Sequence, residues 1–436
     1  MNKIQKFPIL CVLTILSVLC NCAAESVRLK NGINIYLEEQ NTSPLTSIQI
    51  WVAVGSVDEP LELSGISHFI EHTIFKGTKT RGRNDIAPAI ERKGGVMNAA
   101  TSKDFTYFYA LVPEQHCTET LDIISDAILN PEFPQEEIDK ERLVVLEEIS
   151  RRDDMPVAVL SNEFYSLIYG TNPYSARILG SSGVITSLSR EKILDFHKSY
   201  YTPDKIFIVL TGKFNSKSVL AQITKYFGAL KYQKTGSKTS NANVSFLPDI
   251  NSSSRSKIFY KNVSQTYMIM GFPAADIKSN DQYKLDVLSY IIGHGKACRL
   301  NKKFVEENKL AYAVSASFST HRGPGLFSIY TECPPGNADT LRNRIMLELL
   351  ELPSSITEEE LSRAKTLLLR DKLLDRQTPD GLADEIGFYA ALGNPDITTR
   401  YIKEIQKVGI HDIGEIIDKY FSFPNLPTVI VTYEDF

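Results

Sequence analysis

The chain repeats one order of predicted elements at two places about 220 residues apart. Each copy opens with a strand that ends at a proline, continues with a helix, and then begins a second, longer helix. The first copy is predicted at residues 106–113, 118–129 and 134–152, and the second at residues 326–334, 338–350 and 357–374. Thr357 is the expected N-cap of the last helix. So large an offset exceeds solenoid repeat lengths and therefore predicts a duplicated domain.

Further strands are predicted wherever apolar or alternating runs are bounded by turn residues. They are residues 33–38, 46–54, 206–212, 257–260, 266–271, 313–319 and 428–433. Each half thus mixes a sheet with helices, which predicts an α+β fold. The chain is 43% hydrophobic and 23% charged, ordinary values for globular domains with sizeable cores. We expect two domains, at residues 25–232 and 257–436, joined by a polar linker at 233–256.

The N-terminus has the pattern of a secretory signal peptide over residues 1–24. Lys3 and Lys6 precede an apolar run at 7–19, and small residues ending at Ala24 suggest the cleavage site. The run is shorter than the roughly 20 residues that span a bilayer, so a stable membrane span is not expected. The segment contains no Arg, which disfavours a mitochondrial transit peptide, and Cys22 leaves a lipid anchor as a weaker alternative.

Charge and cysteine content indicate neither a nucleic-acid-binding protein nor a disulfide-rich one. The formal net charge is -4, so nothing indicates a nucleic-acid partner. Beyond the expected signal peptide only Cys117, Cys298 and Cys333 remain, far apart and odd in number. No disulfide framework is predicted, although a single bridge among them stays open.

The stretch His68-Phe-Ile-Glu71-His72 points most directly to chemistry. On a helix, His68 and His72 lie one turn apart and project from the same face. Two neutral imidazoles so placed can bind zinc, and Glu71 is free to act as a general base on a metal-bound water. The chain has only 7 His, so a chance match is improbable. The alternative is a pair of surface histidines on an amphipathic helix.

A hydrolytic zinc site needs a third protein ligand, and the helix around residues 138–149 offers three glutamates. Glu141 and Glu148 are two turns apart and share a face, whereas Glu147 points roughly 100° away from Glu148. Spacing alone does not decide among these three residues. The helix also fits a charged surface helix whose glutamates pair with Arg151 and Arg152.

Three stretches resemble the pitrilysin/insulinase superfamily of inverted zinc peptidases. They are residues 68–78, 94–106 and 141–149, and they look most like the branch with mitochondrial processing peptidase and its bacterial relatives. The resemblance extends from Val27 to the C-terminus and is most specific over residues 49–155. It implies that each domain is a mainly antiparallel sheet packed with helices, and that the chain forms half of a clamshell.

The resemblance also implies the site and the reaction. Zinc, one ion per chain, is expected on His68, His72 and Glu148, with Glu141 orienting a ligand. Glu71 is expected to be the general base on a zinc-bound water in peptide hydrolysis.

The same resemblance assigns substrate binding to a strand near the start of the first copy. Asn98 and Ala99 look like the family's edge strand, which pairs with an extended peptide. From the residues alone, Asn98 fits a turn after Gly94-Gly95 equally well.

The second half carries no zinc motif. Ala364 and Asp371 stand where the second copy should match Glu141 and Glu148, and His294 is expected in a Gly-His-Gly loop. Family members often carry an arginine seven residues before the tyrosine placed as Tyr312 is here, and the pair holds the substrate carbonyl. Here that position is Val305. We therefore expect a dimer, with a related chain supplying an Arg/Tyr pair, although Tyr312 also fits a core aromatic.

These observations favour a zinc endopeptidase acting on peptides or unfolded segments. The alternative is a catalytically inert assembly subunit of the same fold, like the core subunits of the cytochrome bc1 complex. A mitochondrial presequence peptidase is disfavoured by the N-terminus. Taken with the resemblance, the signal peptide leads us to expect a bacterial periplasmic protein.

Overall fold

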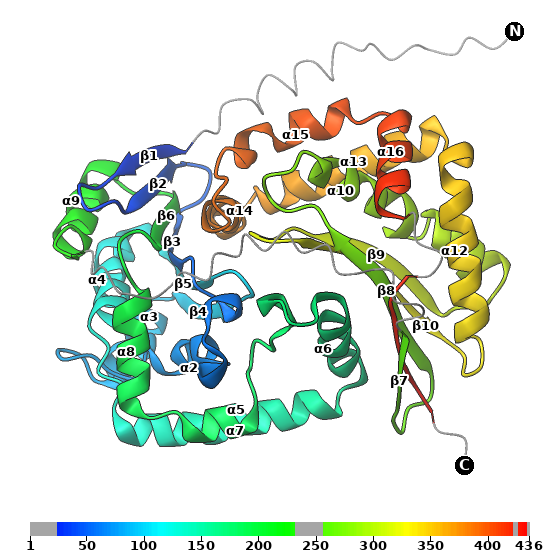
Figure 1. The fold of residues 1–436 in the computed structure, drawn as a ribbon. Coiled ribbons are helices and arrows are strands. Elements are labelled where there is room, and N and C mark those ends of the chain that lie inside the picture. Colours follow the sequence, from blue (N-terminus) through cyan, green and yellow to red (C-terminus); the bar gives the residue numbers. More distant parts are fainter. Residues whose placement is uncertain (1–23, 232–255, 422–425, 434–436) are drawn as a thin grey trace, which may run out of the picture.

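The first half of the chain forms a six-stranded sheet in the order β1-β2-β6-β3-β5-β4. The computed structural model describes residues 24–231, 256–421 and 426–433 (Figure 1). The six strands are β1 (Glu25–Arg28), β2 (Asn34–Glu39), β3 (Leu45–Val52), β4 (Val96–Thr101), β5 (Thr106–Pro113) and β6 (Ile206–Gly212). All pairs are antiparallel except β2 with β6. Because β4 ends the sheet, one side of its backbone has no strand partner in the described residues.

The second half forms a five-stranded sheet in the order β7-β11-β8-β10-β9. Its strands are β7 (Ser256–Tyr260), β8 (Thr266–Ala274), β9 (Ala313–Ser319), β10 (Gly325–Cys333) and β11 (Thr428–Thr432). Only β7 and β11 are parallel. Both sheets are therefore mainly antiparallel.

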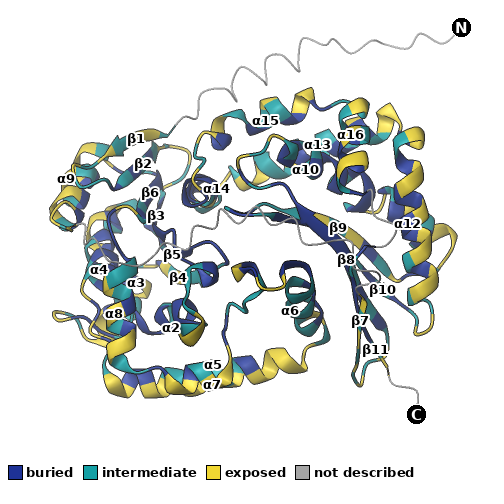
Figure 2. Ribbon diagram, in the orientation of Figure 1, coloured by how far each residue is buried: buried dark blue, intermediate teal, exposed yellow. Residues whose placement is uncertain are grey.

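Helices cover the two sheets, and their solvent-facing sides are exposed (Figure 2). Those of the first half are α2 (Ile66–Thr73), α3 (Ala87–Glu91), α4 (Cys117–Leu129), α5 (Gln135–Asp154), α6 (Pro156–Tyr169), α7 (Ser182–Ser187), α8 (Arg190–Tyr200) and α9 (Ser216–Phe227). Those of the second half are α10 (Asp281–Gly293), α11 (Arg299–Asn301), α12 (Ala338–Ser355), α13 (Glu358–Asp375), α14 (Pro379–Ala391), α15 (Ile397–Lys407) and α16 (Ile410–Tyr420). In both halves, the strand of the repeat is followed by two helices in succession, α4 and α5 after β5, and α12 and α13 after β10.

Each half contributes one helix that packs on the sheet of the other half. Helix α6 packs on β8 and β11 of the second sheet, and α14 packs on β3 and β6 of the first. At the second contact, Trp51 of β3 lies so close to Gly387 of α14 that a Cβ at residue 387 would come within 2.1 Å of its ring. The two halves are thus joined by packed helices and not only by the connecting chain.

The predicted α+β fold with two similar domains is confirmed. Strands β5 and β10 and helices α4, α5, α12 and α13 follow the predicted duplication. Thr357 caps α13, and Glu360 completes the capping box. The short, exposed strand β1 was not predicted, because only Val27 of its four residues is even partly buried.

Several predictions concern residues that the structure does not describe. The expected signal peptide lies outside the described residues except for Ala24, and the expected linker does so except for Ser256, which begins β7. Among the described residues, no helix combines the length and apolar character needed to cross a membrane. Cys117, Cys298 and Cys333 are all buried and free, so the disulfide left open by the sequence is not formed.

Candidate metal centre

Helix α2 carries the histidine pair, and its start is fixed by hydrogen bonds from its backbone to a side chain. The Glu59 carboxylate accepts from the N–H groups of Gly65 and Ser67, at 2.7 and 2.8 Å. Gly65 has a φ of 96°, and a Cβ there would lie 2.6 Å from the carbonyl oxygen of Leu179. The helix then buries Ile66, Phe69 and Ile70 completely, which turns the opposite side towards α5.

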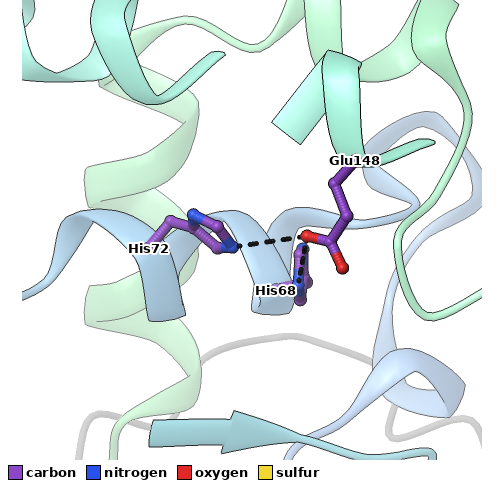
Figure 3. Close-up of side chains that lie close together, drawn as sticks. All are labelled: His68, His72 and Glu148. Atoms are coloured by element: carbon purple, nitrogen blue, oxygen red, sulfur yellow. Dashed lines mark ion pairs between the residues drawn. The ribbon is translucent and has the colours of Figure 1, made fainter. Parts of the chain in front are cut away.

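His68, His72 and Glu148 come together between α2 and α5, as Figure 3 shows. The Nε2 atoms of His68 and His72 each lie 3.7 Å from Oε2 of Glu148. One potential ligand atom from each residue lies within 4.8 Å of the others, and this is the one such group of three among the described residues. Only 8% of His68 is exposed, so the alternative of two surface histidines is wrong.

The protonation state of His68 suits a metal ligand. Burial, together with the neighbouring His72 and Arg152, lowers the pKa of His68 to about 3. The imidazole is therefore neutral at physiological pH and has a lone pair to donate. Its Nδ1 atom is buried without a hydrogen-bond partner among the described residues. The other nitrogen, Nε2, is the one that faces Glu148, and the two Nε2 atoms with one carboxylate oxygen form a donor set that fits a cation.

The three candidate glutamates of α5 occupy different environments. Glu148 faces the histidines, and its Oε1 lies 3.5 Å from Nε of Arg152. Oε2 of Glu141 lies 3.3 Å from Nδ1 of His72, and its Oε1 lies 2.5 Å from Nζ of Lys76. Glu147 is exposed. Geometry thus separates residues that spacing alone could not, and the predicted surface pair of Glu148 with Arg152 is present as well.

Glu71 lies beside the cluster and is oriented by β4. Its Oε2 accepts a hydrogen bond of 2.6 Å from the Thr101 hydroxyl. Burial raises the pKa of Glu71, while the bond from Thr101 and the nearby His72 oppose that rise. A carboxylate with a raised pKa next to a candidate metal site has the properties of a general base.

Asn98 and Ala99 belong to strand β4, so the alternative that Asn98 sits in a turn is wrong. The strand is at the sheet edge, as the resemblance implies. The backbone N–H of Ala99 donates to Oδ1 of Asn98 at 2.9 Å, and Asn98 is exposed. This edge is open to an added strand once that side chain moves.

Tyr312 lies just before β9 in the second half, and 58% of it is exposed. The alternative that it is a core aromatic is therefore wrong. None of the contacts found among the described residues joins Tyr312 to the histidine pair. Val305, in contrast, packs against the hydrophobic core of the second half.

A cavity of about 790 Å³ lies between the two halves beside the cluster. Its lining includes Ser102 and Arg152 from the first half and Tyr290, His294 and Asp371 from the second. The three candidate ligands lie outside the lining, but Arg152 contacts Glu148, so the cavity adjoins the cluster. It is large enough for part of an extended chain.

Sequence reasoning missed the groups that hold the site in place. Glu59 binds the start of α2, Thr101 binds Glu71, and Lys76 binds Glu141. Each contact joins different elements or crosses a loop, so no local spacing in the sequence reveals it. Thr101 lies inside a stretch that drew the family resemblance, and that signal could have identified it.

The sequence is similar to known families and proteins. Residues 34–182 match the insulinase family, peptidase family M16, and residues 187–368 match the peptidase M16 inactive domain. An uncharacterized zinc protease from Rickettsia felis is 32% identical over 91% of this chain and 94% of the relative. A second, from Bacillus subtilis, is 28% identical over 90% and 94%.

The fold is similar to that of solved structures. A protease from Helicobacter pylori superposes with a TM-score of 0.87 at 26% identity, covering 93% of this chain and 98% of that one. A peptidase M16 inactive domain from Pseudomonas fluorescens, at 16% identity and a TM-score of 0.82, shares the fold over 94% of this chain and 98% of its own. With the matched residues and the similarity to the Rickettsia protein, the chain belongs to the insulinase family, peptidase family M16.

Proposed function

We propose that the chain is a zinc-dependent endopeptidase that hydrolyses peptides or unfolded segments. The observation that carries the proposal is the convergence of His68 and His72 with Glu148, next to Glu71. The names of the relatives, zinc proteases, support the same reaction class.

His68, His72 and Glu148 would hold the zinc ion. Two imidazole nitrogens and a carboxylate oxygen are a donor set found in hydrolytic zinc sites, which keep a further position open. Glu141 would fix the ring of His72, since a carboxylate on the second ring nitrogen sets the tautomer. Zinc bound there would supply Lewis acidity, which polarises a peptide carbonyl and lowers the pKa of water.

The remaining groups of the site would act on protons and on the substrate backbone. Glu71 would accept the proton of the attacking water and return it to the leaving amine. Thr101 would keep the acting carboxylate oriented. The free edge of β4 would pair with an extended peptide through main-chain hydrogen bonds, which give affinity with little sequence selectivity. Because that edge contacts the substrate along its length, internal bonds would be cut.

We also propose that the chain belongs to the processing-peptidase-like branch and works with a related chain. Val305 is apolar and packed where the family pattern has an arginine, so a guanidinium for the substrate carbonyl would come from a partner. An active homodimer in native mass spectrometry of the endogenous protein would overturn this part of the proposal.

The test measures hydrolysis of a quenched fluorescent peptide by protein purified together with any bound partner chain, with bound zinc quantified in the same sample. Wild type is compared with Glu71→Gln and with Glu147→Gln, a control on the exposed side of α5. We expect zinc in all three and turnover in wild type and Glu147→Gln only. The loss in Glu71→Gln should reach at least about 100-fold, the lower range for a general base.

Other outcomes would separate the alternatives. Zinc without turnover in any sample would indicate a missing partner chain. No zinc in any sample would overturn the proposal and favour the inert assembly subunit.

A further inference from the structure

The loop between β9 and β10 reaches from the second half into the first. Arg322 donates from Nε to Oδ1 of Asp104 at 3.0 Å and from Nη2 to Oδ2 of Asp58 at 2.6 Å. Its neighbour His321 donates from Nδ1 to Oδ2 of Asp104 at 3.0 Å. We call His321, Arg322, Asp104 and Asp58 the inter-half clasp. One guanidinium thus bridges two carboxylates that lie on different loops of the first half.

The clasp is buried, and both carboxylate oxygens of Asp104 accept hydrogen bonds. Asp104 is 1% exposed and also accepts from the hydroxyl of Tyr174, which in turn accepts from the N–H of Gly323 at 2.9 Å. Burial opposes ionisation, but the bonds from His321, Arg322 and Tyr174 keep the pKa of Asp104 below its ordinary value. A buried charge with this many donors fixes the position of the loop that carries it.

One carboxylate of the clasp, Asp104, is connected through β4 to Glu71, the proposed general base. Asp104 follows strand β4 and lies three residues after Thr101, whose hydroxyl holds Glu71. Between them, the carbonyl groups of Ser102 and Lys103 accept from the N–H groups of residues 56 and 57, at 3.2 and 3.0 Å. This segment therefore has little freedom to shift while Asp104 is held.

The other carboxylate of the clasp, Asp58, is connected to the start of α2. Asp58 precedes Glu59, whose carboxylate holds the first turn of the helix that carries His68 and His72. Asp58 Oδ2 also accepts from the N–H of Gly55 at 3.0 Å. A Cβ at Gly55 would come within 2.4 Å of the Lys103 carbonyl oxygen, so the two loops pack without a gap.

We propose that Arg322 is a positioning residue for the site of the first half. By holding Asp104 and Asp58 together, it sets β4 with Thr101 on one side of Glu71 and the start of α2 on the other. The half without metal ligands would thus contribute to the reaction by fixing the half that has them. This inference rests on the proposed peptidase function for its effect on turnover, but not for its effect on β4.

The test replaces Arg322 and follows β4 directly. Arg322→Gln is compared with wild type and with Lys257→Gln, which removes the ion pair of Lys257 with Glu163, a pair that also joins the two halves but leads to no site residue. Hydrogen–deuterium exchange of peptides covering residues 96–105 is measured with zinc bound, together with zinc content, kcat and KM.

We expect Arg322→Gln to exchange at least about fivefold faster over residues 96–105, while exchange in β5 and zinc content stay unchanged. We expect kcat/KM to fall about tenfold or more, since small displacements of a catalytic group are costly. Lys257→Gln should match wild type. Arg322→Lys should recover part of the loss, because an ammonium reaches one carboxylate but cannot bridge two in a fork.

If Arg322→Gln does not fold, Asp58→Asn takes its place, because it removes the negative charge of Asp58 from the contact with Arg322 and leaves Asp104 paired. Unchanged exchange over residues 96–105, with kcat/KM within about twofold of wild type in the folded variant, would overturn the inference. Exchange needs no turnover. An inactive wild type would therefore count against the proposed function, while the exchange data would still decide whether Arg322 positions β4.

Discussion

In both halves of the molecule, two ring side chains one helical turn apart face a carboxylate from a neighbouring helix. In the first half these are His68 and His72 with Glu148. About 220 residues later they are Tyr290 and His294, at the end of α10, with Asp371 of α13. The rings of Tyr290 and His294 stack at 4.0 Å. The two halves thus share the arrangement but differ in its chemistry.

The difference lies in whether the groups satisfy one another. The Tyr290 hydroxyl donates to Oδ2 of Asp371 at 2.8 Å, and burial together with that carboxylate raises the pKa of Tyr290, so the donor stays protonated. In the first half both imidazoles stand 3.7 Å from Glu148, too far for good hydrogen bonds. Groups that cannot satisfy one another are expected to bind a shared cation, and groups that can are expected to stabilise the fold.

Replacing a candidate metal ligand of the first half by the residue type found at the corresponding place in the second half should have the largest effect on zinc affinity. In His68→Tyr the phenol replaces a neutral nitrogen ligand and can donate to Glu148 as Tyr290 does to Asp371. We expect zinc affinity to fall at least about 100-fold, because a binding free energy of about 10–16 kcal/mol is shared among three or four ligands. Competition with a chelator measures this change.

The same substitution at His411, which is 89% exposed, is the matched control and should leave zinc affinity unchanged. Tight zinc binding by His68→Tyr would show that the first-half cluster does not need the imidazole that distinguishes it from its counterpart.

Glu141 has no acidic counterpart in the second half, where Ala364 stands, and this is the next difference to test. Glu141→Gln removes the charge next to Nδ1 of His72 and releases Lys76. We expect zinc affinity to fall about 10- to 100-fold, the usual cost of losing a carboxylate that orients a histidine ligand. Glu147→Gln, one residue from Glu148 but exposed, should leave it unchanged, and equal losses in both would indicate a general charge effect.

Much of this arrangement could be predicted from local patterns, because local forces create it. Alternating burial in β5 and the capping box at Thr357 are written in neighbouring residues. The histidine spacing likewise fixed which face of α2 carries the site. The third ligand was not decided by spacing, since Glu141 and Glu148 share a face of α5, and the resemblance was needed to choose between them.

The rest depends on residues far apart in the chain. The exchange of α6 and α14 between the sheets leaves no periodic signal, because their partners lie in the other half. Arg322 contacts Asp104 although more than two hundred residues separate them in the sequence, and no local pattern around either residue predicts the contact. Tyr312 fits a buried aromatic by composition, yet only the folded chain shows that its ring is exposed.

Thr101 provides a smaller test that depends on pH. The hydrogen bond from Thr101 lowers the pKa of Glu71 against the effect of burial, so Thr101→Val should raise that pKa further. A general base acts when deprotonated, and the acid limb of kcat/KM should therefore move to higher pH, by about one unit for one lost charged hydrogen bond. Thr366→Val on α13, whose hydroxyl donates to the carbonyl of Ser362 in its own helix, is the control. A shift to lower pH, or none, would show that Thr101 does not support the ionised form.

The smallest effect is expected in the second half, where the cluster should matter for stability alone. Tyr290→Phe removes the bond to Asp371, which keeps Arg370 as a partner, with Nε of Arg370 2.7 Å from its Oδ1. The free energy of unfolding should fall by about 1 kcal/mol, the net value of one hydrogen bond, measured by urea denaturation. Zinc affinity and kcat/KM should not change, because the first-half ligands remain. A loss of activity without a loss of stability would mean that the Tyr290 hydroxyl, which lines the cavity, contacts the substrate, and the two clusters would then share one task.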